Sequence, residues 1–346
     1  MGTWMNVLAL SQAASQLMAD DKGLLAIDES NVTCDKRFAA QGIPQTEAVR
    51  RAYRELLVTT PQLNRAISGV ILYDETIRQR TEDGRTFAGV LADAGIIPGI
   101  KVDIGAKQLP GHPGETVTEG LDGLRERLQE YRQLGARFAK WRAVIALGEG
   151  LPSRGCIHAN AHALARYAAL CQEAGLVPVV EAEILMDGDH GLERSRDATV
   201  EILQAVFRQL RDQRVMLEGM ILKPNMVLPG LASATQVTVD EVADETLSCL
   251  MQVVPAAVPG IAFLSGGQSP ELATARLNAM NVRTPPGSRV PWVLTFSFAR
   301  AIQQAALQIW QGQEANVVAA QEALRRRAML DRLARRGEYD AAMESA

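Results

Sequence analysis

Short apolar runs recur along the chain at a nearly constant spacing, and this repeat constrains the fold more than any other feature. Each run is rich in Val, Ile, Leu and Ala, ends in polar or ionisable residues, and precedes a stretch with helical periodicity. The eight runs are Leu24–Asp28, Gly69–Glu75, Ile97–Asp103, Phe138–Arg142, Val177–Glu183, Gly219–Lys223, Ile261–Gly267 and Trp292–Ser297. Their mean spacing of roughly 38 residues suits a strand, a helix and two connections. The sequence therefore predicts a repeated βα unit.

The stretches between the runs have the pattern of crossover helices. Leu121–Leu134, His158–Ala174 and Thr199–Arg211 carry apolar residues three and four positions apart. The runs themselves are continuously apolar, as parallel strands covered on both faces are. We therefore predict an α/β fold, a single-domain (β/α)8 TIM barrel over residues 1–346, with a helical segment at 1–22 and a helical segment with a short tail at 313–346. An open doubly wound sheet is the alternative, but no GxGxxG motif follows the first run.

Composition and charge exclude several classes of protein. With 346 residues, 47% of them apolar, and a net charge of −4, the chain can bury a large core and has no general electrostatic affinity for nucleic acid or an acidic membrane. No run of apolar residues is long enough to span a membrane, and the first 22 residues lack a basic stretch before their apolar ones, which predicts a cytoplasmic protein. The four scattered cysteines are expected to be free thiols. The arginines between Arg325 and Arg336 are interpreted as one solvated helix face.

Ionisable residues gather at the ends of the predicted strands, where (β/α)8 enzymes carry their chemistry. Only six of the 36 basic residues are lysine, and random placement would put roughly 0.4 of them at strand ends. Three lie there, namely Lys101, Lys140 and Lys223. The pairs Lys140 with Arg142 and Glu181 with Glu183 are two residues apart, so each pair faces one side of its strand. A catalytic site is favoured over its alternative, a layer of ion pairs filling the barrel.

Several lysines in one apolar site suit nucleophilic catalysis by an amine. Burial and a cationic neighbour both disfavour the ammonium form, so they raise the fraction of neutral amine at pH 7. Lys223 follows an apolar run and is the candidate nucleophile, with Lys140 as its cationic neighbour. Near the end of the chain, Ser265-Gly266-Gly267 and Arg300 could hold a phosphate, and Ser30, Thr33, Lys36 and Arg37 a second one. His158 and His162 lack the accompanying carboxylate of a metal motif, so we predict no catalytic metal.

The motifs together resemble class I fructose-bisphosphate aldolase from about Gly23 to about Tyr339. The resemblance is carried by Ala26-Ile27-Asp28-Glu29-Ser30, Gly99-Ile100-Lys101-Val102-Asp103, Phe138-Ala139-Lys140-Trp141-Arg142, Val180-Glu181-Ala182-Glu183-Ile184-Leu185, Leu222-Lys223-Pro224-Asn225-Met226 and Phe263-Leu264-Ser265-Gly266-Gly267-Gln268. It implies reversible, metal-independent cleavage of fructose 1,6-bisphosphate to dihydroxyacetone phosphate and glyceraldehyde 3-phosphate in glycolysis and gluconeogenesis. It also implies a homotetramer that acts on small sugar phosphates and uses no cofactor.

The resemblance assigns roles to individual residues. Lys223 matches the lysine that forms a Schiff base with the substrate ketone, and Glu181 matches the general acid/base. Asp28, Lys140 and Glu183 match residues that orient hydroxyls and relay protons. The phosphate at the ketone end would be held by Ser265, Gly266, Gly267, Ser297 and Arg300. The second phosphate would be held by Ser30, Thr33, Arg37, Lys101 and Arg142.

Several positions depart from the family pattern. Ala299 replaces a glycine whose N–H meets the phosphate, so a positive φ would be strained there. Phe298 replaces a tyrosine and Ala182 a proline, and neither change removes a catalytic group. Animal members end in a tyrosine, whereas this chain has Tyr339 and then ends at Ala346, which leaves the preference between bisphosphate and fructose 1-phosphate open. Two alternatives remain: the same chemistry on another ketose such as sedoheptulose 1,7-bisphosphate, and a non-catalytic scaffold on the same fold.

Overall fold

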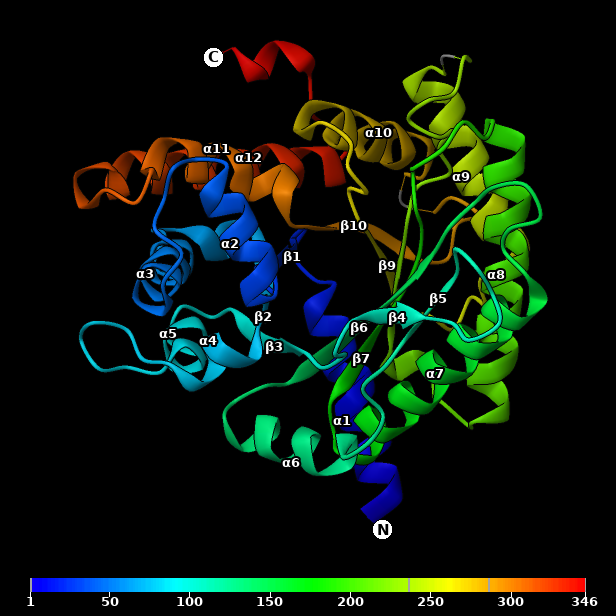
Figure 1. Ribbon diagram of the computed structural model, residues 1–346, viewed down its shortest axis with the longest axis horizontal. Coiled ribbons are helices and arrows are strands. Elements are labelled where there is room, and N and C mark those ends of the chain that lie inside the picture. The colour runs from blue at the N-terminus through cyan, green and yellow to red at the C-terminus, as the bar shows by residue number, and fades with distance from the viewer. Residues whose placement is uncertain (1, 236, 286, 346) are drawn as a thin grey trace.

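Eight parallel strands form a closed barrel at the centre of the molecule (Figure 1). The computed structural model describes residues 2–235, 237–285 and 287–345. Around the barrel the strands follow the order β1-β10-β9-β8-β7-β6-β3-β2. They are β1 (Gly23–Ala26), β2 (Ile67–Leu72), β3 (Ile97–Lys101), β6 (Phe138–Ile145), β7 (Val177–Ile184), β8 (Ile221–Pro224), β9 (Gly260–Phe263) and β10 (Val293–Phe298). Each predicted run contributes one strand, so the (β/α)8 barrel is confirmed.

Helices surround the barrel, and several of them begin after a hydroxyl-bearing residue. Ser30, Thr46, Ser153, Thr238 and Ser269 each accept a hydrogen bond from a backbone N–H of the first turn that follows. The helices are α1 (Gly2–Leu17), α2 (Asn31–Ala39), α3 (Glu47–Val58), α4 (Asp74–Arg78), α5 (Phe87–Asp93), α6 (Leu124–Gln133), α7 (Arg154–Glu173), α8 (Leu192–Asp212), α9 (Val239–Val253), α10 (Pro270–Arg283), α11 (Arg300–Trp310) and α12 (Val317–Arg335). In the described ranges no helix combines the length and apolar character needed to cross a bilayer.

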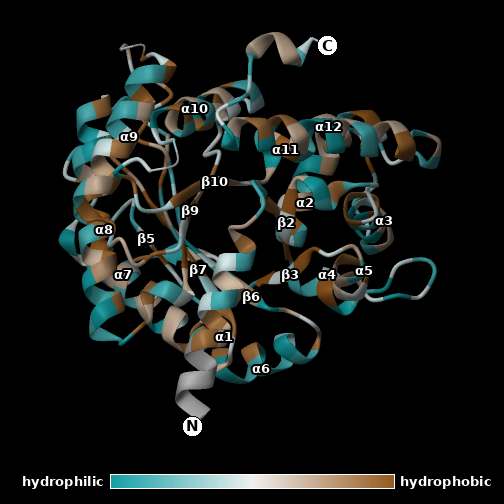
Figure 2. Cartoon of the chain, turned by 180° about the vertical axis from the view of Figure 1, so that it is seen from behind, coloured by the Kyte–Doolittle hydropathy of each residue, from teal (hydrophilic) through white to brown (hydrophobic). Residues whose placement is uncertain are grey.

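Helix α1 closes the end of the barrel at which the strands begin. Its residues Ala14 and Leu17, with Met18 after it, are buried in a cluster with Ile71 and Phe138 from inside the barrel. Figure 2 shows hydrophobic residues where α1 meets the strands and hydrophilic residues on the outer surfaces of the surrounding helices. This end is therefore a sealed apolar core.

Glycines make room for a large ring inside that core. A Cβ added at Gly99 would lie 2.3 Å from the Phe138 ring, and one added at Gly69 would lie 3.1 Å from that ring and 2.8 Å from Leu17. Because the strands converge around this ring, only residues without a side chain fit opposite it.

The arginines of α12 do not form a single solvated face, so that interpretation is wrong for two of them. Arg327 and Arg335 are buried. Arg335 donates hydrogen bonds to the carbonyls of Met18 and Lys22, which anchors α12 to the closed end of the barrel. Arg327 donates to Glu344 at 2.7 Å and so fixes the segment that follows α12.

One small sheet lies outside the barrel and outside the predicted elements. Strands β4 (Ala106–Gln108) and β5 (Thr116–Thr118) form an antiparallel hairpin after β3. All three β4 residues are exposed. Thr118 nevertheless donates from its hydroxyl to the Arg142 carbonyl at 2.8 Å, so the hairpin packs beside the open end of the barrel.

Candidate active site

A cavity of about 1110 Å³ opens at the end of the barrel where the strands finish. Its volume lies just above the usual range for small-molecule sites. Every candidate residue from the sequence lines it: Asp28, Ser30, Thr33, Lys36, Arg37, Lys101, Lys140, Arg142, Glu181, Glu183, Lys223, Ser265, Gly266, Gly267, Ser297 and Arg300. The strand register explains the convergence, because Glu181 pairs with Arg142 on one side and with Lys223 on the other.

Two lysines share one buried carboxylate at the floor of the cavity. Lys223 Nζ lies 3.2 Å from Glu181 Oε1, and Lys140 Nζ lies 2.9 Å from Glu181 Oε2. Lys140 also donates to Asp28 Oδ2 at 2.9 Å. All four side chains are buried. The sequence predicted the lysines to be neighbours, and the structure adds that Glu181 lies between them.

The environments of the two lysines push their pKa values in opposite directions. Burial lowers the pKa of Lys223, and the positive charge of Lys140 lowers it further; together they outweigh Glu181. Burial also opposes the charge of Lys140, but Asp28 and Glu181 outweigh it and raise the pKa of Lys140. Lys140 is therefore a fixed cation, and Lys223 is the amine more readily deprotonated.

The carboxylates of this group remain ionised despite burial. Burial alone would raise the pKa of Asp28, but Lys140 and Lys223 together lower it to about 2. Glu181 is likewise buried, and the positive charges of Lys140, Lys223 and Arg142 lower its pKa. Both carboxylates can accept protons or hydrogen bonds at neutral pH.

Two further ion pairs line the walls of the cavity. Arg142 donates through Nε to Glu183, and the arginine side chain remains 42% exposed while the glutamate is buried. Lys101 donates to the side chain of Asp103 and to its backbone carbonyl, the latter at 2.9 Å. Arg142 and Lys101 therefore place positive charge at the mouth of the cavity, and the ion pairs with Glu183 and Asp103 fix the positions of these two side chains.

The loop after β9 has the backbone of an anion-binding turn. Gly266 and Gly267 have φ values of +56° and +87°, which only glycine adopts without strain. A Cβ added at Gly267 would lie 3.7 Å from Arg300 Nη2, so the loop and the first residue of α11 are adjacent. The Ser297 hydroxyl beside them is buried without a hydrogen-bond partner in the described ranges, which points to a ligand that completes it.

Ala299 does not carry the strain that the sequence suggested. Its φ is −110°, outside the left-handed region, so an alanine fits at this position. The residue precedes Arg300 at the beginning of α11. The alanine therefore leaves the backbone N–H groups of this turn in place.

The second group of candidate phosphate ligands lies at α2. Ser30 caps the helix by accepting from the Thr33 backbone N–H at 3.3 Å, and the two hydroxyls lie 3.1 Å apart. Arg37 is held by Glu29, and its Nε and Nη2 atoms have no hydrogen-bond partner among the described residues. Gln303 also bonds to Arg37. Neither Glu29 nor Gln303 was among the candidates: Glu29 belongs to the motif Ala26–Ser30 but was assigned no role there, and no motif marks Gln303.

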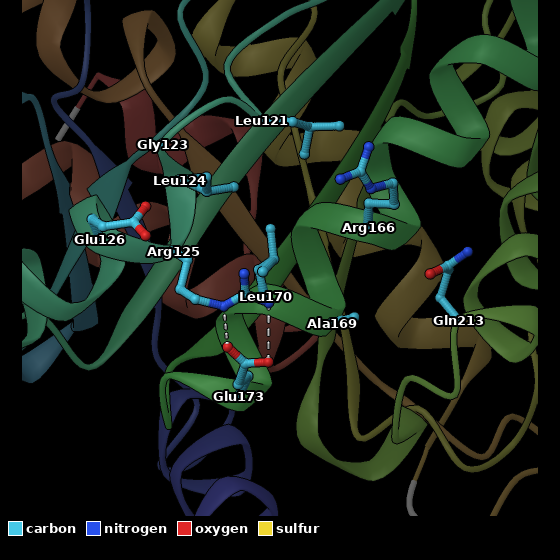
Figure 3. Close-up of a pocket in the computed structure, with 10 residues that line it drawn as sticks. All are labelled: Leu121, Gly123, Leu124, Arg125, Glu126, Arg166, Ala169, Leu170, Glu173 and Gln213. Carbon is cyan, nitrogen blue, oxygen red and sulfur yellow. Dashed lines mark hydrogen bonds and ion pairs between the residues drawn. The ribbon is translucent and has the colours of Figure 1, made fainter.

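A second cavity, of about 290 Å³, is lined by α6, α7 and residues beside them (Figure 3). Its ion pair joins Arg125 Nε to Glu173 Oε1 at 2.6 Å, and both side chains are more than half exposed. None of the candidate residues lines this second cavity.

The histidines and cysteines lie outside both cavities. His158 and His162 are exposed, and all four cysteines are buried free thiols. No group of three or more metal-ligating side chains occurs within the described ranges.

Comparison with known proteins gives the class to which this fold and site belong. The family model described as fructose-bisphosphate aldolase class-I matches residues 9–346. A probable class 1 fructose-bisphosphate aldolase of Xanthomonas campestris is 55% identical over 97% of this chain and 99% of its own. A cytosolic aldolase of Arabidopsis thaliana is 49% identical over 94% of this chain and 82% of its own.

A solved structure agrees with these relatives. The fructose-bisphosphate aldolase of Plasmodium falciparum, determined in complex with TRAP and a small-molecule inhibitor, is 44% identical and has a TM-score of 0.94 over 97% of this chain and 96% of that one. The barrel with buried lysines at its open end thus defines a lyase of the (β/α)8 type. The chain belongs to the class I fructose-bisphosphate aldolase family.

Proposed function

We propose that this protein reversibly cleaves fructose 1,6-bisphosphate to dihydroxyacetone phosphate and glyceraldehyde 3-phosphate through a Schiff base on Lys223. The observation that carries the proposal is the buried contact of Lys223 with Glu181, beside the fixed charge of Lys140, on the floor of a cavity lined by phosphate-binding groups. Family membership supports the same reaction.

Imine formation needs a neutral amine and a proton donor. Glu181 first takes a proton from the Lys223 ammonium, and the neutral Nζ then adds to the substrate C2 carbonyl. A proton moves from the added nitrogen to the carbinolamine oxygen, Glu181 returns its proton to the same oxygen, and water leaves as the protonated imine forms. Glu181, 3.2 Å from Lys223 Nζ, is close enough to exchange protons with the same atom. The lowered pKa of Lys223 raises the fraction of neutral amine that begins the sequence.

Carbon–carbon cleavage uses the protonated imine as the electron sink. A base takes the proton from the C4 hydroxyl, the C3–C4 bond breaks to release glyceraldehyde 3-phosphate, and its electron pair moves toward the imine nitrogen to give an enamine. Glu181 is the base, while Asp28, Lys140 and Glu183 hold hydroxyls and relay protons. Protonation at C3 and hydrolysis then release dihydroxyacetone phosphate and free Lys223.

The ends of the cavity would hold the two phosphates. The Ser265–Gly267 turn, Ser297 and Arg300 form the site at the ketone end, where the unpartnered Ser297 hydroxyl can donate to a phosphate oxygen. The second site is formed by Ser30, Thr33, Arg37, Lys101 and Arg142, whose three cationic side chains can donate hydrogen bonds to the phosphate oxygens.

The reaction is tested by steady-state cleavage of fructose 1,6-bisphosphate with and without EDTA. We expect full activity after chelation, because amine chemistry and not a metal stabilises the carbanion. Loss of most activity in EDTA, restored by a divalent metal, would contradict the proposal. Cleavage of sedoheptulose 1,7-bisphosphate at the higher kcat/KM would instead assign the chain to that substrate.

We further propose that the protein is a cytoplasmic homotetramer. Bacterial relatives and a cytosolic plant relative support this compartment, although the curated relatives also include chloroplastic ones. Light scattering of the purified protein should give about four times the chain mass of 37.5 kDa. A mass of one or two chains at micromolar concentration would contradict the tetramer, and recovery with a membrane fraction would contradict the compartment.

A further inference from the structure

Glu29, next to the site residue Asp28, lies at the edge of the cavity and accepts hydrogen bonds from donors on three helices. Successive residues of an extended segment point to opposite sides, so Asp28 meets Lys140 in the barrel while Glu29 meets the helix layer. Glu29 accepts from Arg37 of α2, from Arg54 of α3 at 2.9 Å, and from Gln303 of α11 at 3.0 Å. Arg54 donates a second time, to the Glu29 carbonyl, at 3.2 Å.

Gln303 joins this group to the backbone of the barrel. It is fully buried, and its Nε2 donates to the Ala26 carbonyl at 2.6 Å as well as to Glu29. Its Oε1 accepts from Arg37 Nη1 at 3.2 Å and from the Tyr53 hydroxyl at 3.1 Å. We call Glu29, Arg37, Arg54, Gln303 and Tyr53 the Glu29 network.

The network holds two guanidinium groups against one carboxylate, and one of the two, that of Arg37, belongs to a residue that lines the cavity. Two guanidinium groups share the single Glu29 carboxylate, whose pKa is lowered because Arg54 and Arg37 outweigh the effect of burial. Arg54 is buried, whereas Arg37 and the Glu29 side chain line the cavity, and the buried Nε and Nη2 atoms of Arg37 have no partner in the described ranges. A buried donor pair that is oriented but unsatisfied points to an anionic ligand.

We propose that Glu29, Arg54 and Gln303 are positioning residues that orient Arg37 toward the second phosphate of the substrate. Gln303 lies one helical turn after Arg300, so the same network fixes Arg37 relative to the first phosphate site. The network thereby sets the distance over which a bisphosphate can bind at both ends. This inference rests on the proposed role of Arg37.

The test compares a bisphosphate with a monophosphate in a variant of Gln303. Gln303→Met keeps the length of the side chain and removes its hydrogen bonds. We expect KM for fructose 1,6-bisphosphate to rise about tenfold with kcat within about twofold. The kcat/KM for fructose 1-phosphate should stay within about twofold, because that substrate lacks the second phosphate. Equal losses on both substrates would overturn the proposal.

A matched control separates orientation of Arg37 from general support of α2. Arg50 ties the same helix to its neighbours through Asp35 at 3.0 Å and Glu75 at 2.7 Å, without touching Arg37. Arg50→Met should therefore leave KM unchanged. If Arg50→Met raised KM as much as Gln303→Met does, the network would merely hold the helix, and the proposal would fail.

A double-mutant cycle distinguishes failure of the network from failure of the phosphate role. Arg37→Ala alone should raise KM for the bisphosphate, and Gln303→Met should add less than about twofold in that background. If Arg37→Ala leaves KM unchanged, the phosphate role of Arg37 is wrong. If Arg37→Ala raises KM but Gln303→Met does not, the phosphate role of Arg37 stands and the network proposal is overturned.

A second variant is available if Gln303→Met does not fold. Arg54→Lys keeps the positive charge but loses one hydrogen-bond donor to Glu29, so it should raise KM for the bisphosphate about threefold.

Discussion

The two ends of the barrel are built from the same strands but from opposite kinds of side chain. At the closed end, Leu17 and Met18 pack with Phe138, and glycines leave space for its ring. At the open end, Lys140, Lys223 and their carboxylates are buried at comparable depth. Burial of apolar groups stabilises a fold, whereas burial of charges costs free energy unless they are paired. The apolar packing at the closed end therefore stabilises the fold, and this offsets the free-energy cost of burying charged catalytic groups at the open end.

The largest expected effect is at the nucleophile of the open end. Lys223→Arg keeps a positive charge but cannot form an imine, so cleavage of fructose 1,6-bisphosphate should fall on the order of 10⁴-fold or more. Folding should be retained, which circular dichroism and thermal unfolding would check. Substantial cleavage by the folded variant would refute the role of Lys223.

The next effect is at the carboxylate between the two lysines. Glu181→Gln keeps the shape but cannot exchange protons, so kcat should fall by about 10² to 10⁴. The substrate KM should change much less, because the phosphate-binding groups remain. The measurement is steady-state kinetics in both directions. A kcat within about tenfold of the original would show that another group moves the proton.

A substitution at the closed end should have the reverse signature. Leu17→Ala removes a buried side chain from the apolar cluster and should lower the free energy of unfolding by about 2–5 kcal/mol. Its kcat and KM should stay within about twofold when measured well below the unfolding temperature. Urea denaturation gives the first quantity. A large loss of kcat in the folded variant would contradict the idea that the closed end affects stability but not catalysis.

The smallest effect concerns a buried carboxylate outside the active site. Burial raises the pKa of Asp331 to about 7, whereas the lysines lower that of Asp28 to about 2. Between about pH 4 and 7, Asp331 is protonated in the folded chain and ionised in the unfolded chain, so its contribution to stability falls as pH rises. Asp331→Asn should remove this pH dependence. As the pH rises through that range, the free energy of unfolding of the variant should increase by on the order of 2 kcal/mol relative to that of the original protein. Unfolding curves at pH 4.5 and 7 that shift equally in both proteins would contradict it.

The strands and the principal site residues could be predicted from sequence because both depend on local signals. A parallel strand covered on both faces must be a continuous apolar run, and a lysine directly after such a run stands out in a chain with few lysines. The hairpin β4–β5 was not predicted because each of its strands has only three residues and those of β4 are all exposed. It carries no hydrophobic pattern.

The remaining features depend on contacts that no local pattern encodes. Gln303 meets Glu29 across 274 residues of sequence, and Arg335 meets Lys22 across 313. Whether an arginine on a helix is solvated or buried depends on which carbonyls face it after folding. For the same reason, the sequence placed Lys140 near Lys223 but could not show Glu181 bridging them.

Imine formation between Lys223 and the substrate can be trapped by borohydride reduction of the protein with fructose 1,6-bisphosphate, followed by peptide mass mapping. We expect a sugar-phosphate adduct on Lys223 and a matching loss of activity. An adduct on another lysine, or no adduct with either this substrate or dihydroxyacetone phosphate, would contradict imine formation at Lys223.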